Sequence, residues 1–370
     1  MKIIAQGVLN AGEANTSRAI GSFPQVVALA SGKLLASYRS GSGKDHDDNN
    51  VEIRSSTDLG ATWSEPRRPW DTTIDSVRGS IGAAKMTEVE PGRLLAAIMW
   101  VDRERYPGKP LFNAETEGCL PMRIFVSESR DEGESWSQLR GVDVPEDLGP
   151  PSLTSPILVL PSGRLALSLE SNKDYLDTSP WLQEVQYVYS NDSGATWGEP
   201  RVISKDPTGR IFNWDQRTGV TSDGAVVSFT WTYDSKEEKY LNIHRRISRD
   251  DSVTWTEPED LGFSDQASVP AIFPDGRVVL AWVDRFGSQS IRARMSERVD
   301  SEFTSQSEVV LWDEAGRRRE IESTGELLAD MGEWNYGLPY CTALPNGEAL
   351  AVFYAGGGPT LDVHWVRLAL

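Results

Sequence analysis

The stretch Ser56-Thr57-Asp58-Leu59-Gly60-Ala61-Thr62-Trp63 decides the fold, because it recurs three more times along the chain. The other copies occupy residues 129–136, 190–197 and 248–255. Together they define the pattern S-x-D-x-G-x-[ST]-W, with Ser252 in place of glycine in the fourth copy. Such internal repeats are typical of propellers, solenoids and other arrays, because one repeat cannot bury its apolar faces alone.

Each copy predicts a tight turn between two strands. The aspartate can bond nearby backbone amides, the glycine allows a positive φ, and the tryptophan can pack the turn onto a sheet. A strand-like run, Val51-Glu52-Ile53-Arg54, precedes the first copy. We therefore expect a structural role for the four copies. We also expect their tryptophans to be buried beside the turns: Trp63, Trp136, Trp197 and Trp255.

A second repeat lies between these turns and consists of an apolar run, a glycine turn and another apolar run. The turn glycines stand between 52 and 71 residues apart, at Gly32, Gly92, Gly163, Gly224, Gly276 and Gly347. Six such hairpins predict an all-β fold, a six-bladed β-propeller with four-stranded antiparallel blades, in one domain over residues 1–370. We expect residues 3–9 to close the ring as the outer strand of the last blade, beside residues 361–368.

The composition excludes several classes of partner. The chain has 370 residues and a formal net charge of −18, which argues against binding nucleic acid or anionic membranes. Two cysteines and three histidines form no metal-binding pattern, and we expect neither a metal nor another cofactor. No apolar run reaches membrane-spanning length. Without an apolar signal segment after Met1, the sequence as it stands predicts a cytoplasmic protein, or a secreted one if a signal peptide once preceded it.

Candidate site residues follow from propeller geometry. Residues that precede the first strand or follow the second strand of each blade meet at the mouth of the central channel. Charged residues close five of the six second strands: Arg39, Asp102, Glu170, Asp234 and Asp284. Carboxylates serve as acid, base or nucleophile, arginines bind carboxylates, and aromatic rings line sugar sites. The alternative for any one of them is a turn cap or an ion pair between blades.

The eight-residue pattern resembles the Asp-box of the sialidase-type β-propellers, in which the box is structural. The resemblance covers nearly the whole chain and implies the same fold. Sialidases of this fold use an arginine triad for the substrate carboxylate, an aspartate as acid/base, and a tyrosine nucleophile activated by a glutamate. Only part of that set has a counterpart here.

Arg39, in Ser37-Tyr38-Arg39-Ser40, resembles the second conserved arginine of the family. The loop after it carries the family's acid/base, which here falls on Asp45, with His46 and Asp47 as alternatives. Arg217 and Arg285 stand in the fourth and fifth predicted blades, where other triad arginines are expected.

Two positions depart from the family pattern. The stretch Gly21-Ser22-Phe23-Pro24 has no arginine where the family's first one is expected. The position of the family's tyrosine falls on Leu338, which is flanked by Tyr336 and Tyr340. These departures put sialidase activity itself in doubt.

We therefore predict a carbohydrate-active enzyme, an exo-acting glycoside hydrolase on an acidic or otherwise decorated sugar, as a monomer or small homo-oligomer. The alternatives are a uronate lyase that uses His46 with Tyr336, and a non-catalytic glycan-binding propeller. The predicted catalytic residues are Asp45, Glu170, Asp215 and Tyr336. The predicted substrate-binding residues are Arg39, His46, Asp102, Arg103, Trp214, Arg217, Gln266, Asp284, Arg285 and Tyr340.

Overall fold

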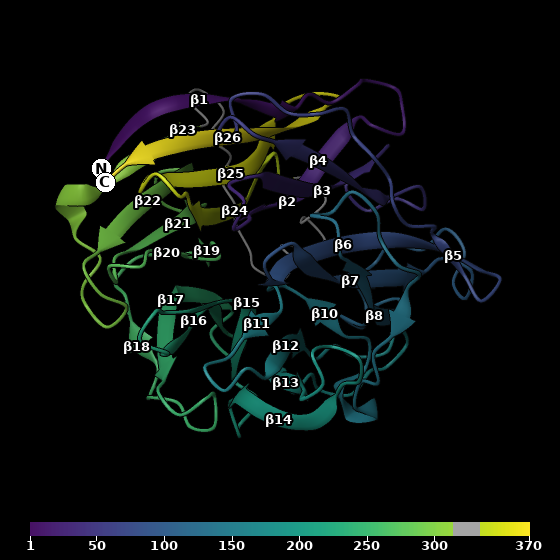
Figure 1. The fold of residues 1–370 in the computed structure, drawn as a ribbon. Helices are drawn as coiled ribbons and strands as arrows, with labels where there is room; N and C mark the ends of the chain where they lie inside the picture. The colour runs from purple at the N-terminus through teal and green to yellow at the C-terminus, as the bar shows by residue number, and fades with distance from the viewer. Residues whose placement is uncertain (314–333) are drawn as a thin grey trace.

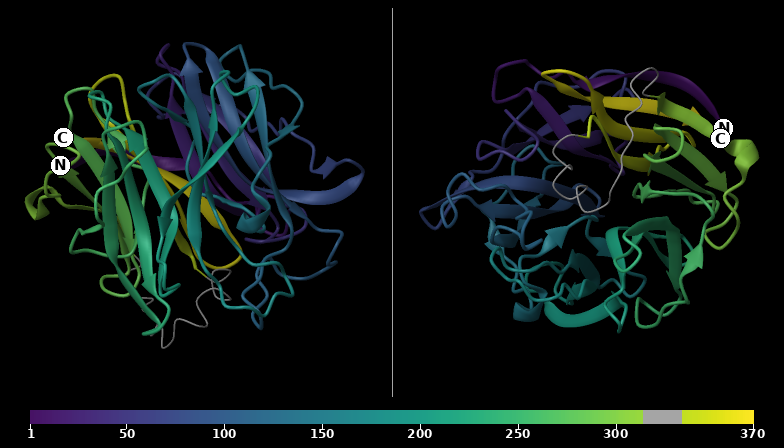
Figure 2. Two further views of the ribbon diagram at one scale, coloured as in Figure 1. Left: turned by 90° about the horizontal axis from the view of Figure 1, so that it is seen from below. Right: turned by 180° about the vertical axis from the view of Figure 1, so that it is seen from behind.

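The computed structural model describes residues 1–313 and 334–370. Their strands form five hydrogen-bonded sheets, which stand around a common axis in a propeller-like arrangement (Figures 1 and 2). The predicted all-β class is confirmed, since the described helices are two single 3-10 turns, η1 (Glu146–Leu148) and η2 (Ser305–Ser307). Within these ranges, no helix has the length and apolar character to span a membrane.

The largest sheet has seven strands and joins the two ends of the chain. Six of them lie in the order β24 (Tyr336–Ala343), β25 (Ala349–Gly356), β26 (Leu361–Ala369), β2 (Ile20–Ala28), β3 (Leu34–Gly41) and β4 (Asn50–Ser56). Strand β1 (Lys2–Asn10) pairs antiparallel with β26, from Lys2–Ala369 to Asn10–Val363. The predicted pairing of the two terminal strands is thus confirmed, and the chain ends lie side by side (Figure 1).

The other four sheets follow one another along the chain. The second contains β5 (Thr73–Ile74), β6 (Val77–Glu90), β7 (Arg93–Asp102), β8 (Met122–Ser129) and β9 (Arg140–Gly141). The third contains β10 (Ser152–Leu153), β11 (Leu158–Val159), β12 (Leu165–Glu170), β13 (Glu184–Ser190) and β14 (Gly198–Lys205). The fourth contains β15 (Ile211–Val220), β16 (Val226–Asp234), β17 (Lys239–Ser248) and β18 (Glu259–Asp260). The fifth contains β19 (Gln266–Ala267), β20 (Ala271–Ile272), β21 (Val278–Asp284), β22 (Ser290–Ser296) and β23 (Val309–Asp313).

All six predicted hairpins are present. The antiparallel pairs are β2–β3, β6–β7, β11–β12, β15–β16, β20–β21 and β24–β25. Every predicted turn glycine has a positive φ, between 76° at Gly92 and 97° at Gly276. A left-handed backbone explains why glycine recurs at these turns, since other residues adopt it at a cost.

The four repeated turns share one hydrogen-bond pattern. In the first, Asp58 Oδ1 accepts from the Thr62 amide at 2.9 Å, and Oδ2 accepts from the Thr62 hydroxyl at 2.6 Å. The Ser56 hydroxyl donates to Asp58 and accepts from the Gly60 amide. Asp131, Asp192 and Asp250 make the corresponding bonds in the other copies. The aspartate therefore holds its own turn, as the sequence predicts.

The fourth copy shows why serine can replace glycine there. Ser252 is fully buried and has a φ of 63°. Its hydroxyl lies 2.9 Å from the hydroxyl of Tyr189, a buried residue of the preceding sheet. This hydrogen bond compensates in part for the strained backbone of a non-glycine residue.

The four tryptophans are half-buried, so the prediction that they are buried is wrong. These four tryptophans, Trp63, Trp136, Trp197 and Trp255, each pack at the edge of a different apolar cluster. The turns stand at the rim of the sheets, where part of each indole remains exposed to solvent.

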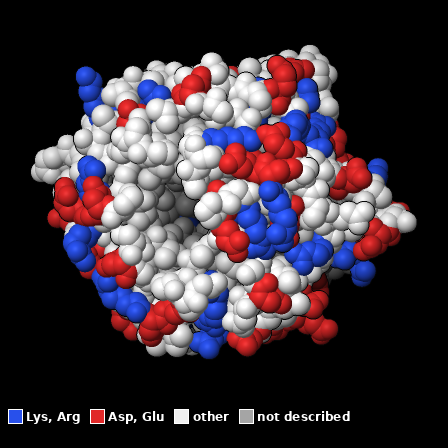
Figure 3. Space-filling view, viewed as in Figure 1, with Lys and Arg blue, Asp and Glu red and all other residues white. Residues whose placement is uncertain are grey.

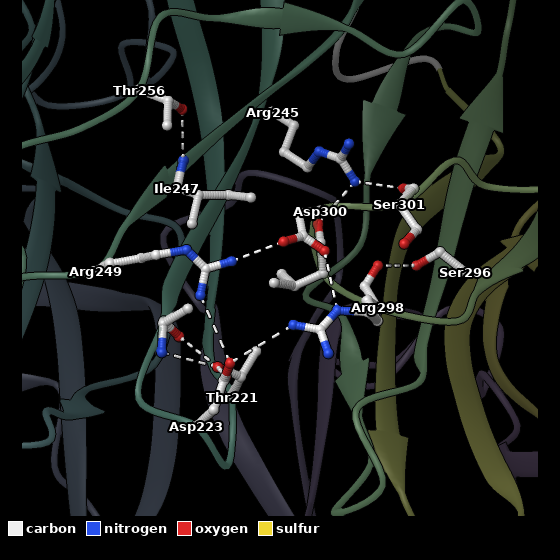
Figure 4. A network of polar contacts seen from close by, with 12 residues as sticks. Thr221, Asp223, Arg245, Ile247, Arg249, Thr256, Ser296, Arg298, Asp300 and Ser301 are labelled. Carbon is white, nitrogen blue, oxygen red and sulfur yellow. Dashed lines mark hydrogen bonds and ion pairs between the residues drawn. The ribbon is translucent and has the colours of Figure 1, made fainter.

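Neighbouring turns are also joined by arginines. Arg67 donates to the carbonyls of Gly133 and Glu134 in the next turn, and Arg140 donates to those of Gly194 and Ala195. Between the fourth and fifth sheets, Arg249 and Arg298 bridge Asp223 and Asp300, with an Arg249–Asp300 distance of 2.8 Å (Figure 4). The face seen in Figure 3 has charged residues of both signs around a hollow centre.

Candidate active site

A cavity of about 510 Å³ lies where the five sheets converge. It is on the side of the loops that follow the second strands, as the sequence predicts for the functional mouth. Seven of the predicted residues line it: Arg39, Asp45, Glu170, Trp214, Asp215, Gln266 and Arg285. They come from four different sheets or the loops beside them, so tertiary convergence alone brings them together.

Backbone irregularities direct three side chains into this cavity. The innermost strands β2, β15 and β24 each carry a register shift, and within these shifts lie Phe23, Asp215 and Leu338. Their φ values are 52°, 48° and 47°, and all three residues line the cavity. A β-bulge re-aims a side chain, and left-handed non-glycine residues gather at functional sites, where surrounding structure maintains the strain. The repeated bulge thus marks this end of the channel as the candidate site.

Glu170 and Asp215 form a carboxylate pair in one wall. Glu170 Oε1 accepts from the Thr154 hydroxyl at 2.7 Å and from the Gln216 amide at 2.8 Å, while Oε2 accepts from the Asp215 amide at 3.2 Å. Burial, followed by the negative charge of Asp215, raises the pKa of Glu170 to about 7. A carboxyl group that keeps its proton near neutral pH can act as a general acid.

Asp215 is held by two partners from its own and the next sheet. Arg217 Nη2 lies 3.1 Å from Asp215 Oδ1, and Gln266 Nε2 donates to Oδ2. Arg217 itself is buried behind Asp215 and donates to the carbonyls of Thr154 and Ala267. The guanidinium therefore compensates the Asp215 charge, while Glu170 has no cationic hydrogen-bond partner among the described residues.

The opposite part of the cavity is cationic. Arg39 and Arg285 are 5% and 2% exposed, and neither pairs with a carboxylate of the described residues. Arg285 Nη2 donates to Gln266 Oε1 at 2.9 Å, so Gln266 stands between Arg285 and Asp215. Burial lowers the pKa of Arg39 to about 10. An anionic ligand group would relieve the cost of burying these charges, because arginine binds carboxylates in two-point geometry.

Two further residues belong to this cationic part. The Lys44 ammonium lies 4.7 Å from the centre of the Tyr354 ring. Burial, reinforced by Arg285 and Arg39, lowers the pKa of Lys44 well below its ordinary value. Burial raises the pKa of Tyr354 against the opposing effect of the two arginines, so its hydroxyl remains a hydrogen-bond donor.

Asp45 lines the cavity in a different setting. Its Oδ1 lies 2.5 Å from Arg103 Nη2, and its Oδ2 accepts from the Leu111 amide at 2.8 Å. Arg103 is 2% exposed and also donates to the Ser80 hydroxyl, so it supports Asp45 from behind and is absent from the lining. Both oxygens of Asp45 are thus engaged as acceptors.

The remaining predicted residues lie outside the cavity lining. The side chain of His46 is 64% exposed and contacts the Ser42 hydroxyl. Asp102 accepts from the amides of Glu104 and Arg105, and Asp284 accepts from those of Gly287 and Ser288. The two aspartates cap turns, which is the alternative that the sequence left open for such residues.

The two predicted tyrosines also lie outside the lining. Tyr336 packs its ring 4.7 Å from that of Trp312, in an apolar cluster between sheets. Tyr340 is buried on the channel axis, where its hydroxyl accepts from Gln25 Nε2 at 3.2 Å. Neither ring reaches the cavity, because the bulge in β24 directs Leu338 there instead.

Sequence reasoning missed Tyr354 and Lys44. It also missed three members of an aromatic wall, Trp181, Trp231 and Tyr240, which Trp214 and Trp334 complete. Tyr354 closes the second strand of its hairpin, so the rule that selected Arg39 and Glu170 also applies to it. It faces Gly337 across the β24–β25 ladder, where an added Cβ would lie 2.9 Å from the Tyr354 hydroxyl oxygen. The missing side chain of Gly337 makes room for this tyrosine.

Among the described residues, no group of three or more His, Cys, Asp or Glu side chains could hold a metal ion. The site therefore consists of a carboxylate pair, a group of cations and an aromatic wall.

Comparison with known proteins identifies the class of fold. No protein-family model matches the chain, and no curated protein matches it. Solved structures do match, and they include sialidases and trans-sialidases, so the chain has a sialidase-like propeller fold. A Dyadobacter fermentans protein of unknown function shares 20% identity, with a TM-score of 0.74 over 100% of this chain and 99% of that one.

Two of the similar structures are intramolecular trans-sialidases. The enzyme from Ruminococcus gnavus, in complex with oseltamivir carboxylate, has 17% identity and a TM-score of 0.65, over 100% of this chain and 98% of that one. The leech enzyme, in complex with 2,7-anhydro-Neu5Ac, has 14% identity and a TM-score of 0.65, over 99% of this chain and 70% of that one. At these identities the likeness concerns the fold alone.

Proposed function

We propose that this protein is a glycoside hydrolase for glycosides whose sugar carries a carboxylate. One observation supports the proposal above all: a single cavity holds the Glu170–Asp215 pair on one side of Gln266 and buried arginines on the other. The carboxylates suit glycosidic bond cleavage, and Arg39 and Arg285 suit an anionic substituent. The carboxylate ligand bound by the Ruminococcus gnavus neighbour agrees with this substrate class.

In this proposal Glu170 is the general acid. A glycosidic oxygen is a poor leaving group unless it is protonated, and the raised pKa of Glu170 keeps a proton available near neutral pH. Asp215 remains the partner carboxylate that stabilises positive charge on the sugar ring or activates water. Asp45, which the sequence favoured as the acid, is assigned a positioning role because it forms an ion pair with the buried Arg103, whereas the described hydrogen-bond partners of Glu170 are uncharged.

The two alternatives from the sequence fare differently. The lyase hypothesis relied on His46 and Tyr336, and neither residue lines the cavity. A glycan-binding propeller without catalysis would use the same cations and aromatic wall. The experiment must therefore separate binding from turnover.

The test is turnover of paired alkyl glycosides, whose leaving groups need protonation, of uronic acids, sialic acid and their neutral counterparts. We expect activity on carboxylate sugars alone, with a loss of about 10²–10⁴-fold in Glu170→Gln and Asp215→Asn, as is typical when a general acid or base is removed. Glu65→Gln, a substitution of an exposed turn residue, is the matched control. Binding of a carboxylate sugar by calorimetry without any turnover would instead identify a binding module.

A second measurement needs no substrate. The folded-state pKa of Glu170 lies above the value of about 4.3 expected for an unfolded chain. The wild type should therefore lose stability as pH rises from about 4 to about 7, whereas Glu170→Gln has no such group to ionise. The unfolding free energy of the variant should improve relative to wild type across this window in urea titrations. A constant difference would refute the raised pKa.

We further propose that the ring has six blades, each with an inner hairpin. Five sheets are hydrogen-bonded as units, and the sixth blade follows from dividing the seven-stranded sheet between β26 and β2. A single parallel pair, Ile20 with Leu361, joins those two strands. The six regularly spaced hairpins support this division, and an experimental structure would test it.

A further inference from the structure

Lys85 is a buried cation that the proposed reaction does not use. It lies on β6, the inner strand of its hairpin, and is 4% exposed. Within residues 1–313 and 334–370, no acceptor forms a hydrogen bond or ion pair with its ammonium group. The side chain is buried and its ammonium group has no acceptor within the described ranges, which is costly for the charged form, so this position calls for a partner that the described residues do not supply.

A second donor on the axis is also left without an acceptor. Lys85 Nζ lies 5.8 Å from the centre of the Tyr340 ring. The Tyr340 oxygen accepts from Gln25 Nε2, so its own proton points elsewhere. The Gln25 carboxamide is already engaged with the backbone of Met86 through both its oxygen and its nitrogen. No described residue accepts the Tyr340 proton.

The charges around Lys85 leave one positive charge uncompensated. Arg217 approaches the axis from β15, but Asp215 pairs with it at 3.1 Å. Among the residues that the structure describes, no second carboxylate accompanies Lys85. Burial, with a further contribution from Arg217 and an opposing one from Asp215, lowers the pKa of Lys85 to about 7. When Lys85 is protonated, the charge imbalance among these described groups is one unit.

We propose that a single small monovalent anion, of the halide class, binds on the channel axis between the Lys85 ammonium and the Tyr340 hydroxyl. One negative charge balances the uncompensated cation, and the anion accepts from both donors that lack an acceptor. The site lies among the inner strands β2, β6, β15 and β24, and it is separate from the proposed carboxylate subsite because neither Lys85 nor Tyr340 lines the cavity. It ties two inner strands, β6 and β24, to one ion.

Affinity at this site should depend on pH. The anion binds Lys85 in its protonated form, so binding weakens as pH rises through the pKa of the lysine, near 7 before the anion binds. The other groups that face this point are Arg217, Asp215 and Tyr340. The pKa of Tyr340 is about 12, because burial raises it, so its hydroxyl stays protonated over this range.

Two measurements on the intact protein test the site. Crystals soaked in sodium bromide at pH 6 should show an anomalous peak between Lys85 and Tyr340. Thermal unfolding at constant ionic strength should shift upward, with saturation, when sodium chloride replaces sodium gluconate, because a ligand of the folded state stabilises it. Density on the axis without anomalous signal would identify water and overturn the proposal.

Variants assign the effect to these side chains. Lys85→Met should abolish the chloride dependence, while Lys236→Met, which removes an exposed charge, should retain it. Tyr340→Phe should weaken chloride binding about tenfold, as expected for one hydrogen bond to a charged group. Chloride dependence that persists in Lys85→Met would contradict the assignment. If Lys85→Met does not fold, the bromide position in wild type and the chloride titration of Tyr340→Phe decide whether the anion binds at this site.

Discussion

Glycine is required for two different physical reasons at the hairpin turns and at the aspartate turns. Gly163 has a φ of 85°, and an added Cβ would meet no atom within 4 Å. Gly194 has a φ of 88°, and an added Cβ would lie 2.5 Å from Leu95 Cδ1 of the neighbouring sheet. The first glycine is required by backbone conformation alone, and the second also by a close contact between sheets.

This difference predicts unequal costs for one substitution. Gly194→Ala should lower the free energy of unfolding by about 2–4 kcal/mol, since it combines a left-handed non-glycine residue with overpacking. Gly163→Ala is the matched control and should cost about 1 kcal/mol, the conformational part alone. Urea unfolding of the two variants checks this. Equal losses would show that Leu95 yields without cost.

At the scale of the element, each repeated turn is held by an ionised aspartate. Asp192 accepts from the amide and the hydroxyl of Thr196, and from the Ser190 hydroxyl. These hydrogen bonds, from Thr196 first, lower the pKa of Asp192 to about 2. The turns stand at the sheet edge, so the bonds are exposed to water and to changes of pH.

Acid should therefore release the turns in a defined pH window. The folded-state pKa is depressed, so the stabilisation is present above the unfolded value of about 3.9 and is lost as pH falls toward 2. Asp192→Asn should be less stable than wild type at pH 7, and the difference should narrow between pH 4 and 2. Asp143→Asn, at an exposed position whose side chain forms no hydrogen bond within the described part of the chain, should show no such narrowing. Urea titrations at each pH measure the difference in unfolding free energy between each variant and wild type.

At the scale of the whole molecule, the first and last strands close the ring. Strand β1 covers β26, and Gly7 lies against Trp365, so closely that an added Cβ would be 2.9 Å from its indole nitrogen. Leu9 of β1 is 3% exposed within the core. Without β1, this edge of β26 would present unpaired backbone groups to other chains.

Deletion of residues 1–11 should therefore destabilise the whole molecule. We expect a loss of at least about 2–3 kcal/mol, the contribution of one buried leucine such as Leu9, together with self-association through the exposed edge. Thermal unfolding and light scattering report the two effects. Ile4→Ser, at a position 41% exposed on the outer face of β1, should change stability by less than about 0.5 kcal/mol. A stable, monomeric truncation would show that β1 does not close the ring.

The local features of this fold could be predicted from sequence, because their interactions span few residues. Asp58 bonds Thr62 four positions away, and each hairpin glycine sits between the two strands it joins. The alternation of strand and turn therefore determined the all-β class. The pairing of the chain ends is not local, but it could be predicted because a ring of hairpins must cover its last edge with the remaining terminal strand. The exposure of the four tryptophans escaped prediction, since it depends on how far each turn stands from the next sheet.

The site was decided by tertiary structure. Two of the charged residues at strand ends, Glu170 and Arg39, line the cavity, but the same pattern also describes Asp102, which caps a turn. No local sequence feature distinguishes a cavity-lining residue from a turn cap, because the direction of the side chain depends on how the backbone bulges of the inner strands turn the chain. The meeting of Glu170 with Asp215, 45 residues apart, and the entry of Tyr354 beside Gly337 arise only when separate sheets converge on one axis.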